Sequence, residues 1–225
     1  MNIALKKFYE AYKLNFRYYF IPMIYFITKS LFYYLGGLDN LTYLGAFTGR
    51  HSFVIEILPL YLIAIYKILN RGTYSMFCRY NSRIDIFKNY YKQASKYTIL
   101  YLTSIYLIIF IFMLGFYKIH DINIIIVTLI NYVIHLIIYL IILSSYLYII
   151  QFNISSNYSG IYLYIFFVIE NYVLFEGIFS KKIPLIITWI DFDGVSLIFK
   201  IIILLIIKNI IYVLSYNKAL EREFI

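Results

Sequence analysis

The sequence contains few charged residues and a single cysteine, and both shortages limit what the chain can be. Only 14% of the 225 residues are charged and 63% are hydrophobic, and the mean hydropathy is +0.80. A water-soluble domain of this length needs far more polar surface, so the composition indicates a membrane protein with no room for a soluble catalytic domain. The lone Cys78 forms no intramolecular disulfide, and no Cys/His cluster suggests a zinc site.

Motifs for catalysis and nucleotide binding are also missing. The chain has no Gly-x-x-x-x-Gly-Lys-[Ser/Thr] sequence, so it cannot hold ATP phosphates as a P-loop protein does. It has no nucleophile motif, metal cluster or carboxylate pair at catalytic spacing. We therefore expect neither enzyme activity nor a metal or cofactor, and an intramembrane enzyme ranks last among the alternatives. The net charge of +9 indicates basic loops of a membrane protein rather than nucleic-acid binding.

Six apolar runs approach or exceed the length of about 20 residues with which a helix crosses a bilayer. They lie at 17–36, 53–70, 98–117, 123–151, 160–178 and 197–216. The runs are continuously apolar, and lipid-exposed backbone must satisfy its own hydrogen bonds, so they predict helices rather than strands. The sequence therefore predicts an all-α fold with one membrane domain over 1–225 and a six-span bundle over 17–216. The fourth run exceeds the length of a span and is expected to tilt or project.

Residues 1–16 mix lysines with apolar side chains that recur every three or four residues. That spacing predicts an amphipathic helix lying in the membrane interface. The apolar run that follows lacks a small-x-small cleavage pattern, so we expect it to stay as the first membrane helix rather than to be removed as a signal peptide.

Basic residues gather on one side of the predicted spans. The N-terminal segment, the connection at 71–97 and the tail at 217–225 hold most of the lysines and arginines, and the opposite connections hold few. The positive-inside rule therefore predicts that both termini and the 71–97 connection are cytoplasmic, in agreement with an even number of spans. The expected location is the cell membrane, as a multi-pass protein.

The connection at 179–196 has an unusual composition. It is too apolar for a solvated loop and too interrupted for a span, because a proline, a glycine and two aspartates break it. These features predict a re-entrant or interfacial hairpin that packs against the bundle on the outer side. The alternative is a longer loop anchored by Trp189.

Six polar side chains fall within the predicted spans, where ionisable groups are costly and mark candidate functional positions. They are Lys29, Glu56, Asn131, His135, Glu170 and Lys208. Lys29 and Glu56 lie at depths that a lysine side chain can bridge. Glu170 and Lys208 fall at similar depth in antiparallel helices, and we expect them to form an ion pair. Structural pairing is the simpler role for each residue, and a place on a transport pathway is the alternative.

Asn131 and His135 lie at i and i+4 and therefore share one face of the predicted fourth span. His135 is the only histidine within a span. A lone histidine is more often a hydrogen-bonded structural residue than a proton relay, although a proton-coupled carrier would also use such a residue.

The connection at 71–97 is basic and lies between two apolar runs. Four of its apolar residues are spaced as one face of a helix: Tyr80, Ile84, Phe87 and Tyr91. Four of its charged residues share another face: Asp85, Lys88, Lys92 and Lys96. The spacing predicts an amphipathic helix that runs along the cytoplasmic surface and leads into the third span. Such a helix either rests on anionic lipid or docks a cytoplasmic partner.

The same connection resembles the cytoplasmic segment of small ABC-2-type permeases. The resemblance rests on the run Arg79-Tyr80-Asn81-Ser82-Arg83, followed by Phe87-Lys88 and Tyr90-Tyr91. In that family an Arg-Tyr-Gly-Ser-Arg-like motif, often followed by paired aromatics, lies between the second and third spans. Here Asn81 replaces the glycine, and Tyr or Phe replaces the tryptophan pair. The predicted plan of spans and connections resembles the family over nearly the whole chain.

The resemblance implies the membrane subunit of an ATP-driven exporter in a bacterial cell membrane, of the type that serves bacteriocin or lantibiotic export or immunity. It implies a peptide, or another amphipathic or lipid molecule, as substrate. The implied partners are a separate ATP-binding subunit docked on 71–97 and a second permease chain, either identical or a sister. The residues implied to contact the ATPase are Arg79, Tyr80, Ser82, Arg83, Asp85, Phe87, Lys88, Lys92 and Lys96.

One class of function does not need ATP. The chain could act alone, either as an ion-coupled carrier that depends on Glu170, Lys208 or His135, or as a standalone bacteriocin-immunity protein. A partner ATPase separates the two classes, because only the exporter requires one.

Overall fold

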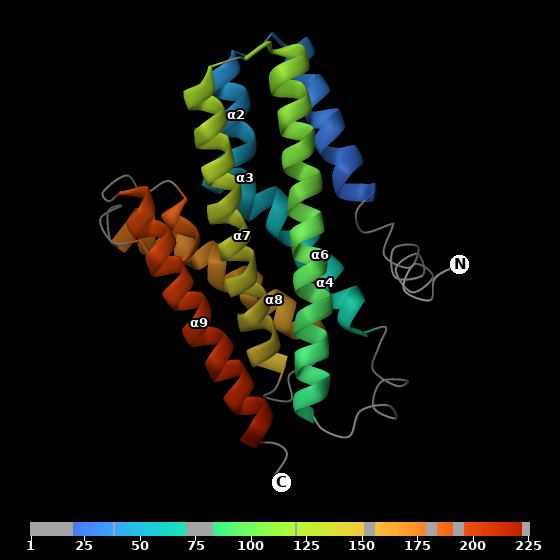
Figure 1. Cartoon of the computed structure of the whole chain (residues 1–225), viewed down its shortest axis with the longest axis vertical. Coiled ribbons are helices and arrows are strands. Elements are labelled where there is room, and N and C mark those ends of the chain that lie inside the picture. The colour runs from blue at the N-terminus through green and yellow to red at the C-terminus, as the bar shows by residue number, and fades with distance from the viewer. Residues whose placement is uncertain are drawn as a thin grey trace.

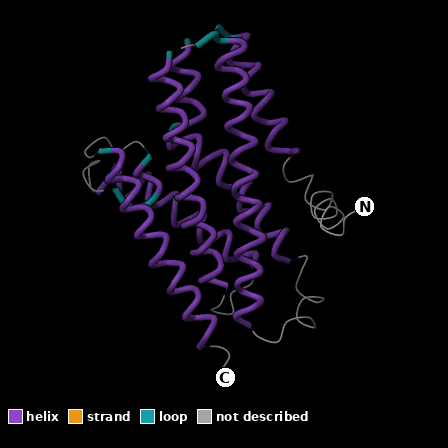
Figure 2. Tube along the Cα trace, in the orientation of Figure 1, coloured by secondary structure: helices purple, strands orange, loops and turns teal. Residues whose placement is uncertain are grey.

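The all-α prediction is confirmed over the part of the chain that the structure describes. The computed structural model describes residues 20–37, 39–70, 83–119, 121–150, 156–178, 184–190 and 196–221. Figure 2 shows that helix makes up nearly all of these ranges and that short loops join the helices. The predicted interfacial helix at 1–16 lies outside the described residues.

The helices form one bundle, which is drawn upright in Figure 1. The first described helix is Phe20–Leu35. The following elements are α2 (Asn40–Thr48), α3 (Arg50–Ser52), η1 (Phe53–Ile57), α4 (Leu58–Asn70), α6 (Arg83–Ile111), η2 (Phe112–Phe116), α7 (Ile122–Ile150), α8 (Ser156–Val168), η3 (Ile169–Ile178), η4 (Ile187–Trp189) and α9 (Leu197–Glu221).

Five continuous helices are long and apolar enough to cross a membrane. They cover Tyr43–Lys67, Ile84–Phe116, Ile122–Ile150, Tyr158–Ile178 and Leu197–Glu221. Each contains most of one predicted span, from the second to the sixth. The first predicted span is represented by Phe20–Leu35, which is apolar but shorter than the other five.

The second helical stretch begins earlier than its predicted span at 53–70. Residues 40–52 were expected in an outer connection, but α2 and α3 make them helical, with a bend at Gly49. The Gly49 amide donates to the Gly45 carbonyl at 3.0 Å. A Cβ on Gly49 would lie 2.5 Å from that same carbonyl oxygen, so the close approach requires glycine.

The amphipathic helix expected in the 71–97 connection leads into the third predicted span, but residues 83–97 do not turn away from that span as a helix lying along the membrane surface would. These residues form the first turns of α6, which continues without a break into the third predicted span. No proline or glycine occurs between Arg83 and Ile111, so nothing in the sequence turns the chain at the membrane boundary. Figure 1 shows α6 as one long, nearly straight helix.

The termini of the long helices lie at the two ends of the bundle. In Figure 1 the start of α6, the end of α7 and the end of α9 lie towards the lower end, whereas the α6–α7 connection lies at the upper end. The first helix rises to the same upper end and is followed by α2. The basic start of α6 therefore lies at the same end of the bundle as the chain's C-terminal helix end.

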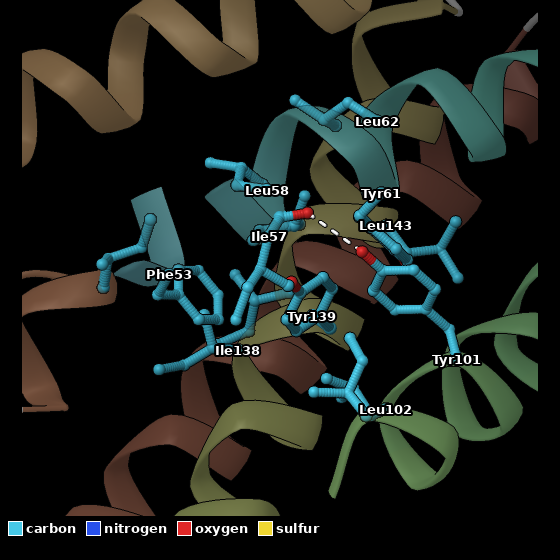
Figure 3. Close-up of a cluster of buried hydrophobic side chains, with 14 of the residues drawn as sticks. Phe53, Ile57, Leu58, Tyr61, Leu62, Tyr101, Leu102, Ile138, Tyr139 and Leu143 are labelled. Atoms are coloured by element: carbon cyan, nitrogen blue, oxygen red, sulfur yellow. Dashed lines mark hydrogen bonds between the residues drawn. The ribbon is translucent and has the colours of Figure 1, made fainter. Parts of the chain in front are cut away.

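Tyrosines occupy the centre of the bundle, where α4, α6 and α7 meet (Figure 3). Tyr61, Tyr101 and Tyr139 are fully buried, and the rings of Tyr61 and Tyr139 meet edge to face at 4.4 Å. The Tyr61 hydroxyl shares a hydrogen bond of 2.7 Å with Thr98. The Tyr101 hydroxyl donates to the Ile57 carbonyl at 3.2 Å, as the dashed line in Figure 3 shows. The centre is thus held by ring packing and by hydroxyl hydrogen bonds between helices.

Large apolar side chains cover much of the outside as well. On α9 alone, many are substantially exposed, among them Ile198, Ile202, Leu205, Ile206, Ile210 and Val213. Soluble monomers rarely expose apolar surface so continuously, whereas helices in a bilayer present such side chains to lipid. The exposed surface therefore agrees with the membrane character inferred from composition.

Three π-helical segments occur among the described residues: η1 lies between α3 and α4, whereas η2 and η3 end the helices that begin as α6 and α8. In η2, the Tyr117 amide donates to the Phe112 carbonyl, five residues earlier, at 3.0 Å. Such turns are rare and often occur at functional sites. Two of the three turns contain carboxylates, with Glu56 in η1 and Glu170 and Glu176 in η3.

Candidate functional site

Lys29 and Glu56, which the sequence placed within reach of each other, form an ion pair with 2.5 Å between Nζ and Oε2. Lys29 Nζ also donates to the Ala46 carbonyl at 2.9 Å, and the Ser52 hydroxyl donates to Glu56 Oε2 at 2.9 Å. The ammonium lies 4.7 Å from the centre of the Phe47 ring. The two side chains are only 10% and 25% exposed, so this polar centre fastens the first helix to α2, α3 and η1.

A second ion pair joins α3 to η3 and was missed by the sequence analysis. Arg50 Nη2 lies 2.6 Å from Glu176 Oε1, and the guanidinium lies 4.8 Å from the centre of the Phe175 ring. Next to it, His51 Nδ1 shares a hydrogen bond of 3.1 Å with the Tyr172 hydroxyl. Arg50 and Glu176 lie near the same end of two antiparallel helical stretches. The comparison of depths in the membrane that linked Lys29 to Glu56 would therefore also have paired Arg50 with Glu176.

Glu170 accepts hydrogen bonds from the backbone of the short turn η4, which identifies η4 as its partner. Its Oε1 receives the amides of Ile186 at 2.5 Å, Ile187 at 2.7 Å and Thr188 at 3.3 Å, and the Thr188 hydroxyl lies 3.4 Å away. Three successive amides that converge on one oxygen bind an anion well. The carboxylate therefore fixes this turn against η3.

The predicted ion pair between Glu170 and Lys208 is wrong. Lys208 Nζ instead donates to the side-chain oxygen of its neighbour Asn209 at 3.1 Å, on an exposed part of α9. Similar depth places two residues at one level of a bundle, but the rotation of each helix decides which way its side chains point. Here α9 packs mainly on α7 and α6, whereas η3 packs on η4.

Residues 184–190 form the described part of the predicted outer hairpin at 179–196. The side chains of Ile187, Thr188, Trp189 and Ile190 are buried. This part of the connection is therefore packed on the bundle through η3 and is not a solvated loop.

Two buried polar groups in η3 lack hydrogen-bond partners. Glu170 and its neighbour Asn171 are both fully buried, and neither Glu170 Oε2 nor the Asn171 amide group has a partner among the described residues. Burying such groups costs free energy, so they are exceptions in a folded protein. Both residues belong to the π-helical segment η3, so this segment places two incompletely hydrogen-bonded polar side chains inside the bundle.

His135 is a buried structural residue of α7. Its Nδ1 shares a hydrogen bond of 2.7 Å with the Tyr106 hydroxyl of α6, and its ring packs 5.1 Å from that of Phe53. Asn131, one turn earlier on the same helix, is only partly buried. The contacts of His135 join α6, α7 and η1, which agrees with the simpler structural role.

The start of α6 has one apolar and one basic face, as predicted. Phe87 and Tyr91 pack against α9, with ring centres 5.9 Å apart for Phe87 and Tyr212 and 4.6 Å apart for Tyr91 and Tyr212. On the other face, the side chains of Asp85, Lys88, Lys92 and Lys96 are exposed. The apolar face is thus used for packing inside the chain, whereas the charged face is exposed, with the Lys88 ammonium 5.7 Å from the centre of the Tyr216 ring of α9.

Three residues of the proposed ATPase contact lie outside the described part of the chain, namely Arg79, Tyr80 and Ser82. Arg83 begins α6. The structure therefore describes the C-terminal half of the 71–97 segment, which carries the exposed lysines.

Among the described residues, no group of three or more His, Cys, Asp or Glu side chains could hold a metal ion. The ion pairs and the Glu170 carboxylate instead join separate helical segments at three places.

The fold is that of a helical membrane protein, with five helices of membrane-crossing length among the described residues. No protein-family model matches the chain, and comparisons with curated proteins and with solved structures find no significant match.

Proposed function

We propose that this chain is the membrane subunit of an ATP-driven ABC exporter, energised by a separate ATPase that docks on the basic end of the bundle. The observation that carries the proposal is the shape of α6. The helix Ile84–Phe116 has 33 residues, which corresponds to about 50 Å at roughly 1.5 Å per residue. The hydrocarbon core of a bilayer is about 30 Å thick, so the charged first turns extend beyond it.

Such a helix can transmit a movement from outside the membrane into the bundle. Its exposed lysines offer a charged surface for a partner, and no proline or glycine interrupts it up to Ile111. Phe87 and Tyr91 connect its start to Tyr212 on α9. A partner that shifts the start of α6 would therefore move α6 and α9 together, as a rigid-body change between two packed states.

The proposal includes a topology. Six spans, with Phe20–Leu35 as the first, place both chain ends and the start of α6 on the cytoplasmic side of a bacterial cell membrane. The connection around η4 is then a re-entrant element on the outer side. The alternation of helix directions in Figure 1 supports this arrangement, and so does the basic character of the 71–97 segment.

The proposed substrate is a peptide or another amphipathic molecule that is moved out of the cell. The chain has no P-loop of its own, so the ATPase is a different polypeptide. A second copy of this chain, or a sister permease, would complete the pathway.

The decisive experiment is affinity purification of the tagged protein from mildly solubilised native membranes, followed by mass spectrometry of the accompanying chains. The proposal expects a stoichiometric P-loop ATPase. A chain that purifies alone in several mild detergents would refute it and would favour a standalone immunity protein or an ion-coupled carrier.

A charge reversal tests the docking surface itself. Changing Lys88, Lys92 and Lys96 together to Glu should abolish association with the ATPase, because the exposed face then repels an acidic partner. The matched control is Lys118→Glu, at an exposed lysine beside the opposite end of α6. Normal assembly of the triple variant would show that this face is not the docking surface.

A further inference from the structure

A groove lies between α4 and α8 on the outside of the bundle. Its volume is about 540 Å³, within the range of about 300–1,000 Å³ that is typical of ligand sites. The walls are formed by Leu62, Ile63 and Tyr66 from α4 and by Tyr158, Ile161 and Tyr164 from α8. Most of this lining is apolar, so the groove suits a hydrocarbon chain.

The groove is open to the surroundings of the protein. Ile63, Tyr158 and Ile161 expose 55%, 60% and 53% of their surface. In a membrane protein, side chains exposed along a span face lipid, so an occupant can enter sideways from the bilayer. An extended peptide would leave its amide groups unpaired against the apolar walls, which makes such an occupant unfavourable.

Gly160 leaves space in one wall of the groove. A Cβ at this position would meet only the Tyr146 ring, at 3.6 Å, which is an ordinary contact. Helix packing therefore does not require a glycine here. A larger side chain at Gly160 would reduce the volume of the groove, which gives a direct way to block it.

Polar groups gather near one end of the groove. Lys67 lies in the last turn of α4, and its ammonium is 5.3 Å from the centre of the Tyr66 ring. Tyr158 lies in the first turns of α8, and both tyrosines line the groove. Lysine and tyrosine at the end of a span mark the interface where lipid headgroups lie.

We propose that this groove binds an anionic phospholipid, with one acyl chain between α4 and α8 and the phosphate beside Lys67 and Tyr66. The apolar walls match the chain, and the ammonium matches the charge of the headgroup. A lysine near an anionic headgroup increases affinity by roughly fivefold. The site needs only a membrane environment, so it stands or falls independently of the partner ATPase.

The test is native mass spectrometry of the full chain taken from nanodiscs that contain equal amounts of phosphatidylglycerol and phosphatidylcholine. The wild-type protein should retain phosphatidylglycerol about fivefold more often. Lys67→Gln should remove this preference while lipid is still retained. Lys118→Gln, which changes an exposed lysine at the opposite end of the bundle, should keep the preference.

A second variant tests the groove rather than the charge. Gly160→Leu should lower retention of both lipids by about tenfold, whereas Gly45→Leu should not, because Gly45 is an exposed glycine of α2 with open space around its Cβ position. Thermal unfolding of each variant establishes that it is folded. Equal lipid retention by wild type and folded Gly160→Leu, no lipid preference in the wild type, or a retained peptide in place of lipid would each overturn the proposal.

Discussion

Glu170 is the residue whose replacement tests the polar centre most sharply. Two of its hydrogen bonds, from the amides of Ile186 and Ile187, are short, and the two from Thr188 are long. A hydrogen bond to a charged group contributes about 1.5–3 kcal/mol, so the two short bonds give about 3–6 kcal/mol. The buried Oε2 has no hydrogen-bond partner among the described residues, which reduces the net stabilisation by this carboxylate. We therefore expect Glu170→Ala to destabilise the packing of η4 by about 3 kcal/mol.

Glu170→Gln separates charge from geometry. The amide oxygen of glutamine can still accept the two short hydrogen bonds, but it carries no charge. We expect a smaller loss of about 1 kcal/mol, because neutral hydrogen bonds are roughly half as strong as charge-assisted ones.

The assay uses the only tryptophan in the chain, Trp189, which is the last residue of η4 and only 7% exposed. In detergent, Glu170→Ala should shift its emission to longer wavelength and increase quenching by acrylamide. These changes should occur below the temperature at which the helices unfold.

The control for this assay is Glu176→Gln. Glu176 also lies in η3, but its carboxylate contacts Arg50 instead of the turn, so this variant should leave the emission of Trp189 unchanged. A folded Glu170→Ala protein whose Trp189 emits and is quenched as in the wild type would refute the reasoning.

Three further predictions concern other buried contacts. Lys29→Met and Glu56→Gln should each lower the free energy of unfolding by about 1–3 kcal/mol. The double variant should lose less than the sum of the two single losses, which a double-mutant cycle measured by thermal unfolding would show. Asn171→Leu should be neutral or stabilising by about 1 kcal/mol in the same assay, because its buried amide has no partner among the described residues. Tyr106→Phe should cost about 1–3 kcal/mol, because it leaves His135 Nδ1 buried without its hydroxyl partner.

Each of these predictions has an outcome that contradicts it. Strict additivity in the Lys29 and Glu56 cycle would show that the pair contributes no coupling. A clear loss of thermal stability in Asn171→Leu would show that the buried amide contributes to folding and would contradict the second prediction. The control for Tyr106→Phe is Tyr132→Phe, which removes an exposed hydroxyl bond to Thr103 and should change stability little; equal effects of the two would contradict the argument from burial.

The outline of the fold was predictable because hydropathy and helical hydrogen bonding act locally. Continuous apolar runs place the helices, since a bilayer admits little else. The Lys29–Glu56 pair could also be predicted, because both residues lie near the same end of successive spans and a lysine side chain is long. The two faces of the segment at 84–96 followed from spacing alone.

Other features depend on how the helices pack, which no local pattern contains. Depth suggested that Glu170 pairs with Lys208, but the rotation of each helix about its own axis turns Glu170 towards η4 and leaves Lys208 beside Asn209. The spacing of residues could not predict the direction of α6 either. An amphipathic segment can lie on a membrane or pack on a neighbouring helix. In this structure the start of α6 packs on α9, where Tyr91 contacts Tyr212. The sequence by itself thus determined the apolar helices within the described residues and the two faces of 84–96, but not the helical start of the second stretch at 40–52. Only the tertiary structure decided the partners of Arg50, Glu170 and Lys208, because contacts between distant segments are set by the packing of the whole bundle.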